Sequence, residues 1–126
     1  DDVEAVRWYR AAAEQGDARA QYNLGVVHYN GKGVPVDCAA AAKWWKLAAA
    51  EGHSGALTFL PLTLTLLFPP GSAVELVGLT TASFNGKRGL VAEGNAAVGR
   101  VVVLLDGEAR AKSFSFENLR VVLDEE

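Results

Sequence analysis

The sequence predicts an α+β protein: an N-terminal antiparallel helical-hairpin repeat, a fragment of an α-solenoid, followed by a small five-stranded β-barrel. Three observations support this prediction. The first part of the chain repeats itself after 36 residues, residues 69 to 72 read Pro-Pro-Gly-Ser, and the residues beyond them fall into short runs typical of strands. We therefore expect two domains, at residues 1–68 and 69–126.

Composition and net charge limit the classes of protein to which the chain can belong. At 126 residues, with 50% hydrophobic and 21% charged residues, the chain has the composition of a folded globular protein. Its net charge of -3 disfavours a surface devoted to nucleic acid. The single Cys38 excludes an internal disulfide and leaves the compartment open, with a cytoplasmic location favoured. Because the chain has no methionine and begins inside a repeat, we expect it to be part of a longer protein.

Capping residues predict three helices in the first domain, at residues 2–15, 18–30 and 38–51. Asp17 and Asp37 precede the second and third helical patterns, where a carboxylate accepts hydrogen bonds from the free N–H groups of the first turn. Each pattern is followed by a glycine suited to the left-handed residue that ends a helix: Gly16, Gly31 and Gly52. The connector between the second and third helices is rich in turn formers, so these two helices should run antiparallel.

The first half of the sequence is internally similar. Shifted by 36 residues, the stretch AVRWYRAAAEQGDARA (5–20) aligns with AAKWWKLAAAEGHSGA (41–56). Trp8 aligns with Trp44 in this comparison. A period in the thirties is typical of stacked helical hairpins, in which each hairpin buries its apolar face against its neighbour.

The stretch AQYNLGVVHYNGKGVPVDCAAAAKWWKLAAAEG (20–52) resembles a Sel1-like repeat, a relative of the tetratricopeptide repeat, and the resemblance extends over residues 5–60. It implies an adaptor-type helical array with no catalytic role. Residues 54–68 depart from the pattern, because Pro61 stands where the repeat predicts the counterpart of Gly25, and we expect them to form an apolar cap. The structural positions of the repeat match these residues: Trp8, Ala20, Leu24, Gly25, Tyr29, Gly31, Gly33, Val34, Asp37, Ala41, Trp44, Ala48, Ala49 and Gly52.

The tryptophans and the small residues are expected to share the packing between helices. Gly25 allows a close approach, while Trp8 and Trp44 fill the space between hairpins. The substitution Trp44→Ala should then destabilise the fold by about 3 to 5 kcal/mol. Trp45 aligns with Tyr9, a position that keeps an aromatic ring and accepts a polar tip, so we expect Trp45 to be the tryptophan that reaches a partner.

Five short runs predict the strands of the second domain: residues 73–78, 88–94, 99–107, 109–116 and 120–123. Asp106 and Gly107 are placed for a tight hairpin turn. Residues 71–123 resemble small Src-homology-3-like and KOW-type barrels, through GLTTASFNGKRGLV, GRVVVLLDG and FENLRVV in this order. One candidate surface of this domain is a basic, partly aromatic edge made of Phe84, Lys87, Arg88, Arg100, Arg110 and Lys112, with a solvated face as the alternative.

The sequence offers no constellation typical of catalysis. His28 and His53 lack partners at metal-ligand spacing, and Cys38 is expected in a first helical turn among alanines, where a small half-buried residue is ordinary. Gly31, Lys32 and Gly33 lack the strand and the Lys-Ser/Thr ending of a phosphate loop. We therefore predict no enzyme active site, no cofactor and no metal. The apolar run at 56–68 is shorter than the roughly 20 residues of a membrane span and is interpreted as core.

These observations favour a protein-interaction module, with an unidentified polypeptide partner and an undetermined oligomeric state. A groove on the repeat would use Asn23, Val27 and Asn30, spaced four and three residues apart, together with Trp45. The alternative is that these side chains only face water. A second hypothesis makes the barrel an RNA-binding module through Lys87 and Arg88, although the acidic balance of residues 69–126 disfavours it. A third makes both domains a targeting region of a larger enzyme.

Overall fold

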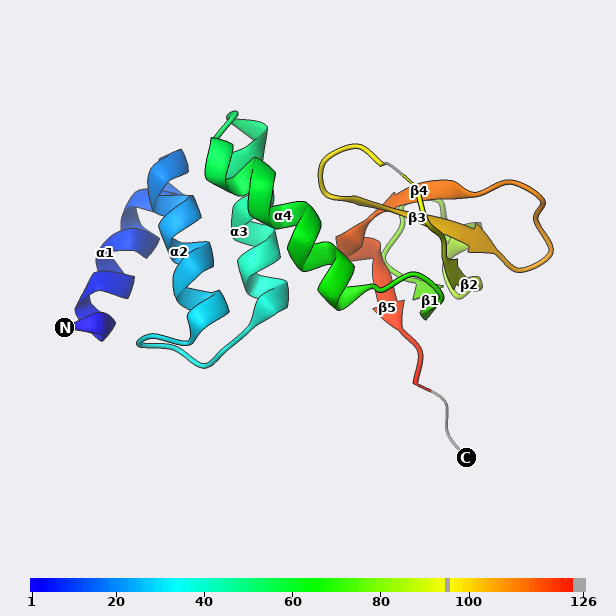
Figure 1. The fold of residues 1–126 in the computed structure, drawn as a ribbon, viewed down its shortest axis with the longest axis horizontal. Helices are drawn as coiled ribbons and strands as arrows, with labels where there is room; N and C mark the ends of the chain where they lie inside the picture. The colour runs from blue at the N-terminus through cyan, green and yellow to red at the C-terminus, as the bar shows by residue number, and fades with distance from the viewer. Residues whose placement is uncertain (95, 124–126) are drawn as a thin grey trace. The chain divides into compact units, whose positions relative to one another are not determined.

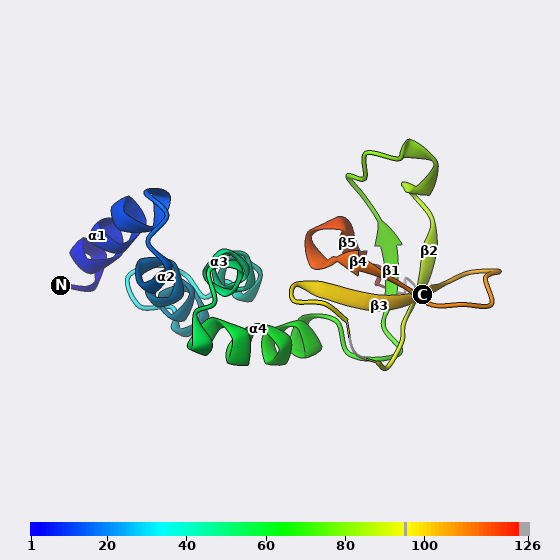
Figure 2. The same cartoon turned by 90° about the horizontal axis from the view of Figure 1, so that it is seen from above.

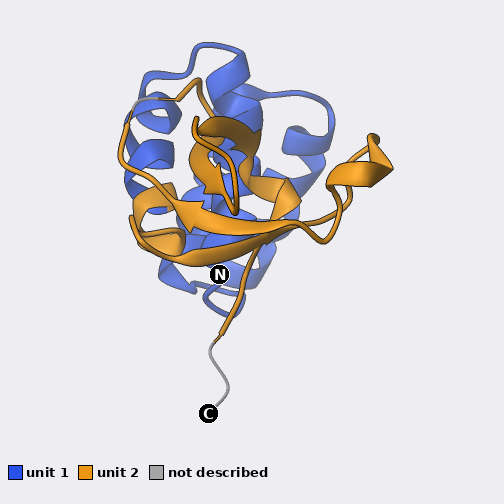
Figure 3. Cartoon of the chain, turned by 90° about the vertical axis from the view of Figure 1, so that its right-hand side faces the viewer, with its two compact units in different colours: residues 1–63 blue, residues 64–126 orange. Residues whose placement is uncertain are grey.

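The chain folds into helices followed by a sheet, as the predicted α+β class requires. A computed structural model describes residues 1–94 and 96–123. The chain divides into two compact units, Asp1–Thr63 and Leu64–Glu126, whose described residues are coloured separately in Figure 3. The division falls inside a helix that spans Ser54–Leu67. The domain boundary proposed from the sequence lies just after that helix.

Four α-helices precede the sheet in the described residues: α1 (Asp2–Glu14), α2 (Ala18–Asn30), α3 (Cys38–Ala50) and α4 (Ser54–Leu67). The first three confirm the predicted helices to within a residue at each end. Asp17 accepts a hydrogen bond from the Ala20 N–H at 2.9 Å, and Asp37 accepts one from the Ala40 N–H at 3.0 Å. These carboxylates satisfy donors that a helix start leaves free, which explains why α2 and α3 begin where they do.

The loop between α2 and α3 returns the chain on itself, so the two helices run antiparallel and side by side (Figures 1 and 2). Gly31 follows α2 with φ 73°, a left-handed value that favours glycine, and its N–H donates to the Val27 carbonyl. The Asp37 N–H then donates to the His28 carbonyl at 2.9 Å. The loop therefore closes the hairpin with hydrogen bonds back to the last turn of α2.

Trp45 is the central packing residue between α2 and α3. Its side chain is only 3% exposed, and its indole N–H donates to the Tyr22 carbonyl at 3.1 Å. The ring lies directly against Gly25, where an added Cβ would come within 2.8 Å of the indole Cε2. Gly25 therefore allows the close helix approach predicted from the sequence. The ring that it accommodates is that of Trp45, where Trp44 was expected.

The expected division of roles between the tryptophans is wrong. Trp44 is half-buried and packs beside the core, whereas Trp45 is buried. Trp8, which aligns with Trp44, is 69% exposed and therefore does not fill the space between hairpins as expected. The reason is helix phase: the alanines three and four residues before and after Trp45 are all buried, so Trp45 occupies the middle of the packed face of α3. The residues that surround it in this way are Ala41, Ala42, Ala48 and Ala49.

A small apolar cluster joins α1 to α2. Val6 and Ala13 of α1 are buried with Ala20 and Leu24 of α2, and the half-buried Tyr9 packs against them. The buried Gln21 side chain donates to the Ala13 carbonyl at 3.2 Å. The same carbonyl accepts from the Gly16 N–H at 3.0 Å, so the Gln21 side chain adds a second donor at the end of α1 and ties α2 to it.

Residues 54–67 form the continuous helix α4, although Pro61 lies within it. Proline lacks the N–H that would donate to the carbonyl four residues back, so the helix accommodates one missing bond. Ala56, Leu60 and Thr63 are buried, and Leu60 aligns with the buried Leu24 one repeat earlier. One side of α4 thus covers the helical repeat, as expected for a cap.

The second unit contains one antiparallel sheet in the order β4-β3-β2-β1-β5. All five predicted strands are present but shorter: β1 (Ala73–Leu76), β2 (Arg88–Val91), β3 (Arg100–Leu105), β4 (Lys112–Ser115) and β5 (Leu119–Val121). Two 3-10 turns, η1 (Ala82–Phe84) and η2 (Phe116–Asn118), precede β2 and β5. In the part of the chain that the structure describes, β4 and β5 are opposite ends of the sheet, so the closed barrel expected from the sequence is corrected to an open sheet.

Alternation along the strands places one apolar face inward. Val74 and Leu76 of β1, with Val101 and Val103 of β3, are buried, and directly paired residues share a face. Phe114 of β4 closes the same side. The turn at Asp106 and Gly107 forms, but β4 starts only at Lys112, so the connection is longer than the tight hairpin predicted.

Candidate protein-interaction surface

The exposed face of α2 carries two of the three groove residues predicted from the sequence. Asn30 is exposed and Asn23 half-buried, and Val26, three residues after Asn23 and four before Asn30, lies between them on this face. Val27 does not belong there. It is half-buried against the cluster of α1 and α2, so its expected contact with a partner is replaced by packing.

Aromatic rings surround Trp45 where α2, α3 and α4 meet. The centroid of the Trp45 ring lies 5.8 Å from that of Tyr29 and 5.9 Å from that of Phe59. Tyr22 lies 6.4 Å from Phe59 and stacks on His53 at 4.5 Å. Trp45 itself is covered, yet two rings around it are accessible, since Tyr29 is 38% and Phe59 44% exposed. This aromatic cluster reaches solvent through Tyr29 and Phe59.

The side of α4 that bears Phe59 continues with Leu62, which is 59% exposed. These two residues align with Asn23 and Val26 one repeat earlier. We refer to five residues of the two helices as the α2–α4 surface: the half-buried Val26 and the exposed Tyr29, Asn30, Phe59 and Leu62. Sequence reasoning missed Phe59 and Leu62, although the same 36-residue shift that identified the repeat places them opposite Asn23 and Val26.

The basic residues of the second unit separate into different groups. Lys87 and Lys112 bring their Nζ atoms within 5.2 and 5.6 Å of the centroid of the Phe84 ring, and Phe84 meets Phe114 edge to face. Lys112 also forms an ion pair with Glu108 at 3.1 Å. Asn85 holds the loop before Lys87 by two hydrogen bonds to the Leu79 backbone.

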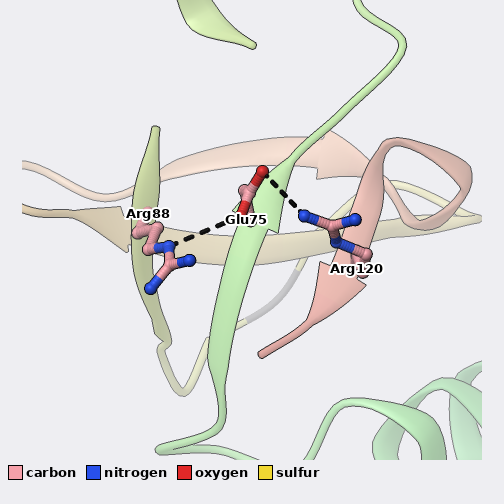
Figure 4. A network of polar contacts seen from close by, with 3 residues as sticks. All are labelled: Glu75, Arg88 and Arg120. Carbon is pink, nitrogen blue, oxygen red and sulfur yellow. Dashed lines mark ion pairs between the residues drawn. The ribbon is translucent and has the colours of Figure 1, made fainter. Parts of the chain in front are cut away.

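Arg88 forms an ion pair with Glu75 and does not join Lys87 at the Phe84 ring. Its Nε lies 3.4 Å from Glu75 Oε1, while the Arg120 Nη2 lies 2.9 Å from Glu75 Oε2 (Figure 4). The hydrogen bond from Arg120, aided by the charges of both arginines, lowers the pKa of Glu75 below its usual value against an opposing effect of burial. Lys87 and Arg88, predicted as one basic site, are therefore engaged separately, by Phe84 and by Glu75.

Arg100, another member of the predicted basic edge, is held on its own strand pair. Its guanidinium donates to the Ser113 hydroxyl at 3.0 Å and to the Ser113 carbonyl at 2.6 Å. From that predicted edge, Phe84, Lys87 and Lys112 are brought together around the Phe84 ring.

The histidines and the cysteine lie apart, in structural positions. His53 accepts a hydrogen bond from the Ala56 N–H at 3.3 Å, at the start of α4. Burial lowers the pKa of His28, and the positive charge of Arg10 lowers it further, while Asp37 opposes both. Cys38 is half-buried in the first turn of α3. Across residues 1–94 and 96–123, no three His, Cys, Asp or Glu side chains gather in a way that could hold a metal ion.

None of the helices among the described residues combines the length and the apolar character that crossing a membrane requires.

Comparison with known proteins finds similarity in the helical part of the chain. The family model described as Sel1 repeat matches residues 1–17 and 18–53. The chain is also similar to a protein named "Chitin synthase regulator SKT5" from Malassezia restricta, with 42% identity over 55 residues. This similarity covers 44% of the chain and 4% of that relative. No solved structure matches the chain.

Proposed function

We propose that this chain is a non-catalytic protein-interaction module whose helical repeat presents the α2–α4 surface to a partner polypeptide. The observation that supports this most is the match of two Sel1 repeats to residues 1–17 and 18–53, which contain α1, α2 and α3. Stacked helical hairpins of this kind build extended surfaces for other proteins. The similarity to a protein named as a regulator agrees with a binding role.

The residues proposed to contact the partner follow from exposure and chemistry. Asn30 offers both a donor and an acceptor at the surface, and Tyr29 adds an aromatic ring with a polar tip. Aromatic residues that combine apolar area with a hydroxyl are enriched at protein interfaces. Asn23 contributes from the same helix face, while Trp45 supports this surface from below rather than touching the partner.

Affinity purification with the full chain as bait tests the proposal. The variant Asn30→Arg places a large charged side chain on the exposed face of α2 without disturbing the core. We expect it to reduce the recovery of specific partner polypeptides at least fivefold, as judged by quantitative mass spectrometry.

Gln15→Arg is the matched control, because it makes the same change from amide to guanidinium at an exposed residue after α1. Equal recovery of every partner by wild type, Asn30→Arg and Gln15→Arg would contradict a binding role for this face. Circular dichroism melting curves of all three chains verify that they remain folded.

The second unit supports a further candidate function. Its strand order, with β5 beside β1 and the turn η2 before β5, agrees with the proposed Src-homology-3-like or KOW-type resemblance. Two ammonium groups near one aromatic ring resemble the elements that bind single-stranded nucleic acid, where lysines contact phosphates and aromatic rings stack on bases. RNA binding by Phe84, Lys87 and Lys112 is therefore the alternative function.

An electrophoretic shift assay with a single-stranded RNA separates the two functions. Binding through the Phe84 cluster should weaken with added salt and be lost in the double variant Lys87→Gln/Lys112→Gln. A retained shift in that variant, or none with the wild-type chain, would count against the alternative. The variant Arg88→Gln serves as a control, since Arg88 pairs with Glu75 outside the cluster.

A further inference from the structure

The two exposed helix faces of the repeat differ in polarity at equivalent positions. Phe59 and Leu62 of α4 stand 36 residues after Asn23 and Val26 of α2. On α2 these two positions hold an amide and a valine, whereas on α4 both hold large apolar side chains. The face that would pack a following helix shows the opposite change, because Ser54, Thr58 and Pro61 replace Ala18, Tyr22 and Gly25. The apolar residues of α4 are therefore not arranged to receive the next helix of a repeat.

The apolar side chains of α4 join the α2 face through the aromatic cluster. Phe59 lies 6.4 Å from Tyr22 and 5.9 Å from Trp45, measured between ring centroids. Tyr22, Val26 and Tyr29 follow one another at spacings of four and three along α2, so they are neighbours on its surface. The α2–α4 surface is thus continuous, with an amide end at Asn30 and an apolar end at Leu62.

The charges on these helices have one sign. Arg19 of α2 is exposed on the face that bears Val26 and Asn30, and Lys32 is exposed just after α2. Neither α2 nor α4 contains an aspartate or a glutamate, and α4 has no charged residue at all. A partner that brings carboxylates to Arg19 and Lys32 is electrostatically favoured. At the α4 end there is no charged residue, so neither sign of charge is favoured there.

We infer that the α2–α4 surface binds a short partner segment with apolar side chains that pack on Phe59 and Leu62 and with acidic residues that meet Arg19. This inference rests on the proposed interaction function and names its partner chemistry. A second copy of the chain is a poorer fit, because the same surface on that copy would bring another Arg19 and no aspartate or glutamate from α2 or α4.

Selection from a displayed library of random 12-residue peptides, with the full chain immobilised, tests the inference. Enriched peptides should combine at least two residues of the Leu, Ile, Phe or Met type with Asp or Glu. Fluorescence anisotropy should then show affinity falling about tenfold in Leu62→Ser, and about threefold in Arg19→Gln with a weaker dependence on salt. Leu57→Ser is the matched control, since Leu57 is a 39% exposed leucine of the same helix, and its affinity should change less than twofold.

The outcomes separate this inference from the function on which it rests. If enriched peptides bind Leu62→Ser as tightly as wild type but lose affinity in Asn30→Arg, the module still binds polypeptides and the apolar end at α4 is refuted. Enrichment of basic or wholly polar peptides refutes the partner chemistry. A library that yields no binder contradicts both proposals. Concentration-dependent dimers that disappear in Leu62→Ser would make a second copy the occupant and overturn the inference.

Discussion

At the scale of single residues, Trp45 decides how α2 and α3 fit together. It combines a large aromatic side chain with nearly complete burial and a hydrogen bond to the Tyr22 carbonyl. An indole N–H placed inside a protein needs such a partner, because an unsatisfied buried donor is costly. Trp44, its neighbour in sequence, lies at the flank of the same helix face and is half-buried.

The two tryptophans should therefore differ in their contribution to stability. We expect Trp45→Ala to lower the free energy of unfolding by about 3 to 5 kcal/mol, because it removes a buried ring and leaves a cavity. Trp44→Ala should cost about 1 to 2 kcal/mol, since part of that half-buried ring stays in contact with water. Urea unfolding followed by circular dichroism measures both values. An equal loss of unfolding free energy in the two variants, or a larger loss in Trp44→Ala, would show that Trp45 is not the main packing residue between α2 and α3.

His28 gives the fold a dependence on pH. Burial and Arg10 lower its pKa below the ordinary 6.5, so the folded state disfavours the protonated form. The unfolded chain then binds more protons as the pH falls below 6.5, and stability present above that value is lost as the pH falls through the lowered pKa of the folded state.

Urea unfolding between pH 7.5 and 5 should thus show a decline in stability that His28→Gln reduces. His53 is present in both chains, so the difference between their stability curves reports His28 alone. Parallel curves for wild type and variant would exclude His28 as a cause.

At the scale of elements, Gly25 allows α2 and α3 to approach each other closely. A Cβ at this position would collide with the Trp45 ring, so the small residue and the large one are matched across the interface. The helix α4 lacks this pairing of a small and a large residue, because Pro61 takes the place equivalent to Gly25. Ser54 and Thr58 lie on the same side of α4 as Pro61. The repeat thus ends in an element that covers its neighbours without receiving another helix.

Gly25→Ala should destabilise the hairpin despite the higher helix propensity of alanine. Overpacking against Trp45 costs about 1 to 3 kcal/mol, while replacing a mid-helix glycine returns about 0.5 to 1 kcal/mol. We expect a net loss of about 1 to 2 kcal/mol in chemical unfolding. Gly25→Ala in a Trp45→Leu background provides the control, because a smaller partner should remove the penalty. A stabilised Gly25→Ala chain would contradict the close approach.

At the scale of the whole molecule, local signals made most elements predictable. Asp17 and Asp37 fix helix starts, Gly31 fixes a helix end, and the change of pattern after Pro69 separates helices from strands. The sheet was predicted in its strands but not in its openness, because closure depends on strand pairing far apart in sequence. That β4 and β5 end the sheet follows only from the registers.

The candidate surface was predicted less well, for a physical reason. Alignment of repeats shows which positions are equivalent, but burial depends on the phase of the helix against its neighbours. Trp45 and Val27 were assigned to the surface and lie in or against the packed faces, whereas Phe59 and Leu62 were treated only as an apolar cap. The alanines on either side of Trp45 in α3 carried the phase signal that would have distinguished the two tryptophans.

Site-specific photo-crosslinking tests the central claim, that the helical repeat is the part of the chain that binds a polypeptide. A benzophenone amino acid is introduced into the full chain at Asn30, Leu62 or Lys87, one position at a time, and adducts formed in cells are identified by mass spectrometry. We expect polypeptide adducts from the Asn30 and Leu62 positions. Adducts obtained only from the Lys87 position, to RNA or to protein, with none from α2 or α4, would contradict it.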